Sequence, residues 1–209
     1  MIIKERFNQK LLVEGNDDQH VIWSLCERFS IAENFDVVEC GGVNRLLEQI
    51  PVRFKQSGIK TIGVIIDADV DMNSRWKSLS ELLAKEHYTV PAQLPGNGLV
   101  LNPASMVKVG IWVMPDNKVN GMIEDFIRFL VPNNDSLLMV ATETLDKIES
   151  KELNKYSLSH KSKALIHTWL SWQEDPGTPM GLAITKKYLT TEKEICSALI
   201  QWIKTTFTT

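Results

Sequence analysis

The apolar run Ile62–Ile66 is the feature that most constrains the fold of this chain. Four of its five residues are β-branched and none is polar, so the alternation typical of a half-exposed strand is missing. A strand of this kind is buried on both faces, as in parallel sheets that are covered by helices. The acidic segment Asp67-Ala68-Asp69-Val70-Asp71 follows at once. We therefore predict an α/β protein whose central strand ends in carboxylates.

Strand-then-helix units flank this run. Short apolar runs at Leu11–Val13, Phe35–Val38 and Gly110–Met114 are each followed by apolar residues at helical spacing, the pattern of parallel strands with crossover helices. Asn16 or Asp17 is expected to cap the first helix, and Pro51 is expected to end the second. The segment 88–108, rich in proline and glycine, is predicted to be a surface loop or an irregular hairpin. The result is a mostly parallel sheet of about four strands flanked by helices.

The last third of the chain shows only helical periodicity. Apolar stripes recur at 135–149, 160–173 and 192–207, and Pro176-Gly177-Thr178-Pro179 interrupts them. We expect residues 1–131 to form the α/β domain and residues 132–209 to form a helical C-terminal extension packed on the same domain.

Composition limits the classes of function. The chain has 23 Lys and Arg against 26 Asp and Glu, a net charge of −3, whereas domains that coat nucleic acid usually have a pI above about 9. Any contact with phosphates must therefore be local. No apolar run approaches the roughly 20 residues of a membrane span. The start of the chain, Met1 to Arg6, is charged at once and lacks a signal peptide's apolar stretch, which predicts a cytoplasmic protein. The three cysteines are expected to be reduced and mostly buried.

Acidic residues follow every predicted strand. In an open parallel sheet the carboxyl ends of the strands meet at one rim, where ligands bind. Carboxylates brought together there repel one another unless a proton or a cation compensates, and Mg²⁺ is the hard ion that such oxygens bind. An Asp after a strand also serves as a turn former or helix cap, so any one of these residues alone is weak evidence. The residues concerned are Glu14, Glu39, Asp67, Asp69, Asp71 and Asp116.

Two of these motifs together resemble the Toprim domain. Leu12-Val13-Glu14-Gly15-Asn16-Asp17-Asp18, followed by Val64-Ile65-Ile66-Asp67-Ala68-Asp69, is similar to the two motifs of that domain, which topoisomerases, bacterial primases, ribosomal-RNA maturases and OLD-type nucleases share. Further stretches at 112–117, 121–125 and 168–173 resemble a group of stand-alone bacterial Toprim-like proteins of unknown function. The motifs cover residues 10–115, and the narrower resemblance covers nearly the whole chain.

The resemblance implies a Toprim-like, Rossmann-like fold and a set of roles. Glu14 matches the general acid or base, and Asp67 and Asp69 match the pair that holds Mg²⁺, for which Mn²⁺ can substitute. Asp71 is expected either to add a metal ligand or to cap a helix that begins near Asn73. Accessory positions are expected at the rim and in the first turns of a later helix, where acids also complement the helix dipole; these are Gly15, Asp116 and Glu124.

The activity that these roles support is metal-dependent phosphoryl transfer. Its simplest form is hydrolysis of a nucleic-acid phosphodiester, with DNA and RNA both left open and with phage defence or RNA processing as the setting. Lys161 and Lys163 are candidates for holding phosphates, although clustered lysines also serve simply as a solvated surface. Topoisomerase activity is disfavoured because it needs a separate large domain that carries a nucleophilic tyrosine. Primase is disfavoured because the accompanying zinc-binding domain is missing.

A second hypothesis comes from a different class. The acidic rim could bind a metal ion or a nucleotide for regulation, on a non-catalytic interaction module. The low net charge and the lack of a basic stripe favour this alternative. Because the sequence contains no G-x-x-x-x-G-K-[ST] loop, any ATPase would be a separate partner chain. A homodimer is the default expectation for its assembly.

Overall fold

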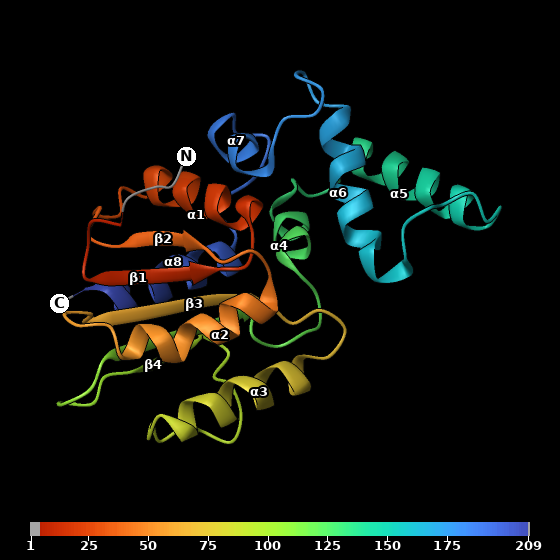
Figure 1. Cartoon of the computed structure of the whole chain (residues 1–209). Helices are drawn as coiled ribbons and strands as arrows, with labels where there is room; N and C mark the ends of the chain where they lie inside the picture. Colours follow the sequence, from red (N-terminus) through yellow and green to blue (C-terminus); the bar gives the residue numbers. More distant parts are fainter. Residues whose placement is uncertain (1–4, 209) are drawn as a thin grey trace.

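A five-stranded sheet forms the centre of the molecule (Figure 1). The computed structural model describes residues 5–208. The strand order is β2-β1-β3-β5-β4, in which β4 alone runs antiparallel to its neighbour. The α/β class and the mostly parallel sheet are thus confirmed. The strands are β1 (Gln9–Val13), β2 (Asp36–Glu39), β3 (Thr61–Asp67), β4 (Leu99–Leu101) and β5 (Lys108–Met114).

Two helices cover each face of the sheet. On one face lie α1 (Asn16–Arg28) and α8 (Glu194–Phe207), which pack on Leu11, Val13 and Ile65. On the other lie α2 (Val43–Phe54) and α3 (Met72–Lys85), over Leu12 and Val64. Successive residues of β1 and β3 therefore enter opposite cores, as the period of a strand requires. Strand β3 is buried along its length up to Asp67, which explains why it has no polar alternation.

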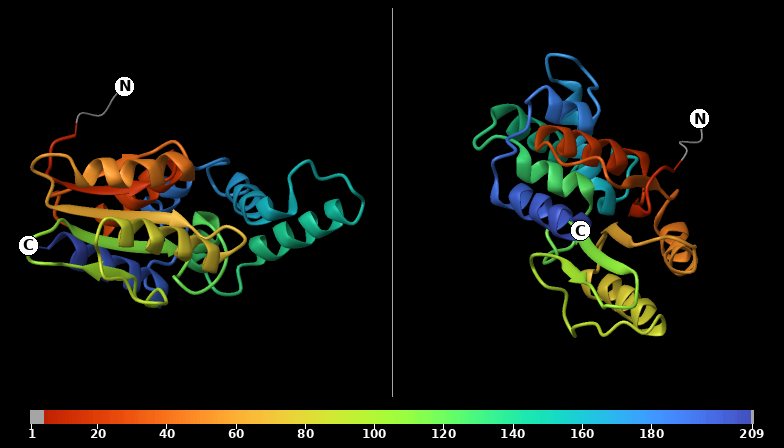
Figure 2. Two further views of the ribbon diagram at one scale, coloured as in Figure 1. Left: turned by 60° about the horizontal axis from the view of Figure 1, so that its bottom comes forward. Right: turned by 90° about the vertical axis from the view of Figure 1, so that its left-hand side faces the viewer.

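Helices α4, α5 and α6 lie beyond one end of the sheet, from which α5 and α6 extend away (Figure 2), whereas α7 packs on α1. The three predicted C-terminal helices are confirmed, and α7 is an additional short helix after the Pro176–Pro179 break. Core residues of α6, α7 and α8 join the same apolar cluster as those of α1 and α4. The elements concerned are α4 (Ile123–Leu130), α5 (Ser136–Glu149), the 3₁₀ turn η1 (Leu158–His160), α6 (Lys161–Ser171) and α7 (Met180–Thr185).

The structure corrects two local expectations and decides a third. Helix α2 continues through Pro51 to Phe54; Ile50 and Phe54 pack into the core beneath it, and this burial outweighs the hydrogen bond that a proline removes. Of the two alternatives for segment 88–108, the structure confirms the irregular hairpin: its first arm is the short edge strand β4, which pairs antiparallel with β5 and brings the strand number to five. The first helix is capped by Gly15 rather than by Asn16 or Asp17.

Gly110 in β5 lets helix α8 lie directly on the sheet. A Cβ atom there would stand 2.5 Å from Thr206 Oγ1 and 2.6 Å from its Cγ2, and Thr206 is fully buried. We expect Gly110→Ala to lower the free energy of unfolding by about 1–3 kcal/mol through overpacking. Adding Thr206→Ala, which removes both clashing atoms, should restore part of this loss. Urea unfolding of the two single variants and the double variant measures the coupling; strict additivity would contradict the predicted contact.

Three further expectations concern compartment and chemistry. In residues 5–208, no helix has the length and apolar character needed to span a membrane. Residues 1–4, which form most of the charged start of the chain, lie outside the described part. Cys26, Cys40 and Cys196 are free thiols in buried or partly buried positions, as predicted, and burial raises the pKa of each.

Candidate functional site

The chain order places the carboxyl ends of β1 and β3 side by side. From β1 the chain crosses to β2 on one side and then returns to β3 on the other, which makes the β1–β3 edge a switch point where open α/β sheets bind ligands. A cavity of about 510 Å³ opens at this edge. We call it the acidic cavity, because carboxylates outnumber the basic residues of its lining, Lys163 and His160. The carboxylates are those of Glu14, Asp17, Asp18, Glu39, Asp67, Asp69 and Glu124.

Glu14 and Asp67 lie next to each other at the base of the cavity. Oε1 of Glu14 accepts a hydrogen bond from the backbone N–H of Asp67 at 2.8 Å. Oδ1 of Asp67 accepts one at 3.0 Å from the N–H of Ile123, the first residue of α4. Burial raises the pKa of Glu14. Burial, followed by the charges of Asp18 and Glu14, raises the pKa of Asp67 well above its ordinary value. Both predicted residues therefore meet, and their charged forms are disfavoured.

Asp69 is held separately from this pair. Its backbone is left-handed, with φ of +52°, and forms a two-bond bridge with Gly121, 2.8 Å in each direction. Its Oδ2 accepts a hydrogen bond from Nη2 of Arg75 at 2.6 Å. Nε of Arg75 donates to the carbonyl oxygen of Asp67 at 2.7 Å. The sequence places two acids two positions apart, but the turn between them sends their side chains to different partners.

Asp18 is a site residue that the sequence analysis missed. It is 5% exposed, and its Oδ2 accepts from the N–H of Gly15 at 3.1 Å. Its Oδ1 has no hydrogen-bond partner among the described residues. Burial, then the charge of Glu14, raises the pKa of Asp18 to about 7. The signal was available, because Asp18 precedes Val21 and Ile22 by three and four positions and so lies on the buried face of α1.

Glu124 and Lys163 face each other across the cavity. Glu124, predicted as an accessory position, is 2% exposed, and its Oε1 lies 3.4 Å from Nζ of Lys163, whose side chain is 52% exposed. Lys163 therefore reaches both the acids and the solvent. Lys161, the other predicted phosphate-binding residue, pairs instead with Asp146 and Glu149 of α5, at 2.7 Å each. Lys161 stands outside the lining of the acidic cavity.

Two predicted acids stabilise local backbone outside the cavity lining. Asp71 caps α3, which begins at Met72, by accepting from the N–H of Ser74 at 3.0 Å and from its hydroxyl at 2.6 Å. Of the two roles considered for Asp71, the geometry matches the cap. Oδ1 of Asp116 accepts from the N–H groups of Lys118 and Val119 at 2.9 and 3.0 Å. Gly15, in contrast, does line the cavity.

Asp71→Ala should therefore affect stability but not the site. We expect the free energy of unfolding to fall, as it does when a helix loses an aspartate cap. Asp71→Ser, which keeps a capping oxygen, should recover most of this loss. Chemical denaturation measures both effects, and a titration with Mn²⁺ should give the same affinity as wild type. A large loss of Mn²⁺ affinity in Asp71→Ala would instead make Asp71 a ligand.

The acidic cavity has the oxygens that a hard cation needs, but they are not gathered around one point. Among residues 5–208, no group of three or more His, Cys, Asp or Glu side chains is arranged so that it could hold a metal ion. Each of the three predicted residues accepts a hydrogen bond that holds it: Glu14 from the Asp67 N–H, Asp67 from the Ile123 N–H, Asp69 from Arg75. Oδ1 of Asp18 is buried without a hydrogen-bond partner in the described part of the chain. A bound cation or a proton would stabilise this oxygen. The donor set fits Mg²⁺ by its chemistry, because carboxylate oxygens are the ligands that this hard ion prefers.

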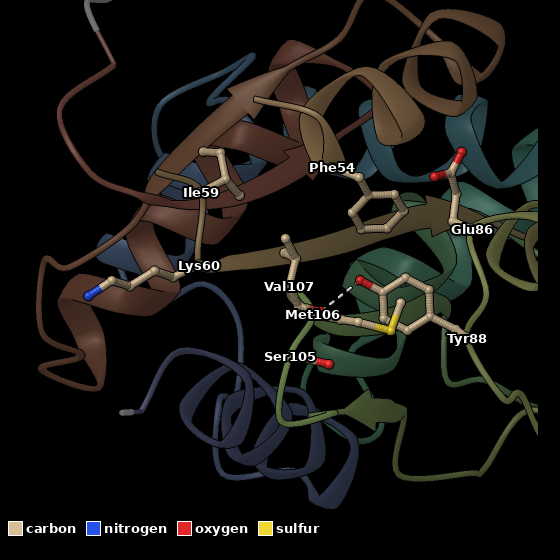
Figure 3. A pocket seen from close by; sticks show the side chains of 8 residues that line it. All are labelled: Phe54, Ile59, Lys60, Glu86, Tyr88, Ser105, Met106 and Val107. Carbon is tan, nitrogen blue, oxygen red and sulfur yellow. Dashed lines mark hydrogen bonds between the residues drawn. The ribbon is translucent and has the colours of Figure 1, made fainter. Parts of the chain in front are cut away.

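A second hollow, of about 600 Å³, lies at the opposite end of the sheet (Figure 3). It lies where β3 and β5 begin, and the rings of Phe54 and Tyr88, whose centroids are 5.3 Å apart, form part of its lining. The Tyr88 hydroxyl donates to the carbonyl oxygen of Val107 at 2.7 Å. The charged lining of the hollow consists of Lys60 and Glu86. The larger hollow is thus remote from the carboxylates that could perform chemistry.

Comparison with known proteins gives a family and no function. A family model described as "Protein of unknown function (DUF3226)" matches residues 8–208. No curated protein matches the chain, and no solved structure matches it.

Proposed function

The chain belongs to the DUF3226 family, and from its site we propose that it hydrolyses phosphodiester bonds of nucleic acid with the help of Mg²⁺ or Mn²⁺. The observation that carries this proposal is the cluster of carboxylates in the acidic cavity, whose charged forms are disfavoured. Asp18 is buried and Asp67 is partly buried beside Glu14 and Glu124, and burial and mutual repulsion raise the pKa of both aspartates. A divalent cation bound among them would remove this repulsion, which makes the cavity a strong candidate for a cation site.

The charge of the cavity also requires a cation before a phosphate can enter. The lining has seven carboxylates, with Lys163 and His160 as its basic members. A phosphodiester would be repelled by such a surface. A bound Mg²⁺ would neutralise the non-bridging phosphate oxygens and the charge on the attacking or leaving oxygen. Metal and substrate binding are therefore expected to be coupled.

The side chains divide the remaining tasks. Glu14, with a pKa raised by burial, is suited to take a proton from water or to give one to the leaving oxygen, because a carboxyl that titrates nearer neutrality is a better acid–base group. Lys163, half-exposed at the cavity, can pair with a second phosphate of the strand. The resemblance of the Glu14 and Asp67–Asp69 motifs to Toprim nucleases supports the same assignment.

A second candidate is favoured by one specific observation. Among residues 5–208, no group of three or more His, Cys, Asp or Glu side chains is arranged to hold a metal ion by itself, whereas one or two carboxylates can hold Mg²⁺ together with the phosphates of a nucleotide. The cavity therefore also fits a non-catalytic module that binds a metal ion or a nucleotide for regulation. Such a protein would bind Mn²⁺ or a Mg²⁺–nucleotide complex and leave phosphodiesters intact. Any protein partner, including a separate ATPase, would then respond to the bound state.

The two candidates are separated by a cleavage assay on the purified full chain. Supercoiled plasmid, single-stranded DNA and structured RNA are incubated with Mg²⁺ or Mn²⁺, and in parallel with EDTA. Hydrolysis predicts cleavage of at least one substrate with metal and none with EDTA. Binding of Mn²⁺ by calorimetry without cleavage of any substrate would reject hydrolysis and favour the regulatory module.

A further inference from the structure

The strongest observation outside the assigned roles is the pair of hydrogen bonds made by Arg75. Its Nη2 donates a hydrogen bond to Oδ2 of Asp69 at 2.6 Å, and its Nε donates one to the carbonyl oxygen of Asp67 at 2.7 Å. The Arg75 side chain is 14% exposed and that of Asp69 is 46% exposed. One guanidinium thus fastens the last residue of β3 to the carboxylate two positions later. Of the two predicted metal ligands, Asp67 and Asp69, it is Asp69 that already forms an ion pair with a cationic side chain.

The backbone of Asp69 is fixed by hydrogen bonds, whereas its side chain can rotate. The bridge to Gly121 fixes the peptide on both sides of the residue. Breaking the bond to Nη2 therefore needs only a rotation of the Asp69 side chain. Because the pair is partly exposed, its strength is modest, and a doubly charged ion beside several carboxylates can compete with it.

The partnerless Oδ1 of Asp18 is an independent sign that the cavity accepts a cation. Asp18 is 5% exposed, and it lies on α1 rather than in the turn after β3. Lys163 pairs with Glu124 across the cavity, and Arg75 pairs with Asp69. Neither cationic group contacts the partnerless oxygen of Asp18, so this buried carboxylate is left without a counter-charge within residues 5–208.

We propose that Arg75 is a latch that occupies Asp69 in the metal-free protein and must release it before Asp69 can join Asp67 in holding a divalent cation beside Glu14. This inference rests on the metal-binding part of the proposed function. It assigns Arg75 a positioning role, acting through Asp69. It also accounts for the absence of an assembled three-acid group within residues 5–208, since one of the three is held by an internal cation.

The latch is tested by titrating Mn²⁺ alone into the purified full chain and measuring its dissociation constant by calorimetry. Removing the competing guanidinium in Arg75→Gln should tighten binding about 10-fold, which corresponds to about 1.4 kcal/mol. Arg75→Lys keeps the charge but not the planar two-bond contact and should give an intermediate value. If Arg75→Gln does not fold, Arg75→Lys provides the comparison.

Two controls separate a latch from a general effect of charge. Lys77→Gln makes the same charge change on the exposed side of α3, where Lys77 reaches Glu81 at 4.0 Å, and should change the dissociation constant less than about 2-fold. In an Asp69→Asn background, Arg75→Gln should also change it less than about 3-fold, because the competition is gone.

Weaker or unchanged Mn²⁺ binding in Arg75→Gln would overturn the latch. No binding by any variant would overturn it together with the metal site. Cleavage measured on the same preparations keeps the two proposals apart. Tighter binding without cleavage supports the latch and rejects hydrolysis, whereas cleavage with unchanged affinity rejects the latch and leaves hydrolysis standing.

Discussion

In buffer that contains EDTA, Asp18→Asn should be more stable than wild type at pH 8, by up to about 4 kcal/mol. The folded protein raises the pKa of Asp18 from its ordinary 3.8 to about 7, first through burial and then through the charge of Glu14. A raised folded pKa means that the associated stability is fully present below the ordinary value and is lost as pH rises through about 7. The asparagine stays neutral and keeps an oxygen for the Gly15 N–H.

Thermal unfolding at intervals from pH 5 to pH 8 tests this expectation. Wild type should lose stability across the range, and Asp18→Asn should lose less. Asp67, whose pKa is also raised, adds to the wild-type slope in the same direction. Glu5 and Asp36, whose pKa values are lowered beside Arg53 and Lys10, lose their contribution only at lower pH and do not disturb the comparison.

Asp17→Asn is the matched control, since it removes the neighbouring charge in the first turn of the same helix. An acid there favours the helix dipole, so this variant should lose about 0.3–1 kcal/mol. Asp18→Asn and Asp17→Asn should therefore move stability at pH 8 in opposite directions. A loss of stability in both would show that Asp18 is ionised at little cost, and would remove the main support for a cation site.

Glu14→Gln should lower metal-dependent cleavage by about 10²–10⁴-fold, the usual contribution of a general acid or base. Asp67→Asn should lower it at least as much, because it also removes charge from the proposed metal site. Both amides keep an oxygen for the hydrogen bonds from Asp67 N–H and Ile123 N–H, so the fold should survive.

Glu143→Gln, an exposed substitution on α5, is the control and should cleave like wild type. Rates are measured under single-turnover conditions on whichever substrate wild type cleaves, with melting temperatures recorded for each variant. Equal cleavage by wild type, Glu14→Gln and Asp67→Asn would identify a contaminating nuclease. A loss confined to Asp67→Asn would keep the metal site but remove Glu14 as the acid–base group.

Much of the architecture was predictable because burial leaves a periodic record in the sequence. The unbroken apolar run at Ile62–Ile66 predicted a central parallel strand, and the stripes at 135–149, 160–173 and 192–207 predicted three helices. The prediction that the second helix ends at Pro51 was wrong, because a local preference does not include the core contacts that stabilise the helix beyond this residue. For segment 88–108 the sequence left a loop and an irregular hairpin open, because only three residues of β4 pair in the hairpin that forms.

The sequence by itself determined the elements, their order and the carboxylates at the strand ends, because periodicity and chain order are local properties. Only the tertiary structure decided which carboxylates meet. Pairing of β1 with β3 brought Glu14 to Asp67, and packing of α1 and α4 added Asp18 and Glu124. Asp71 became a cap, Lys161 was taken by α5, and Asp69 was taken by Arg75. Spacing along a chain cannot specify these partners, since each depends on where a distant segment folds back.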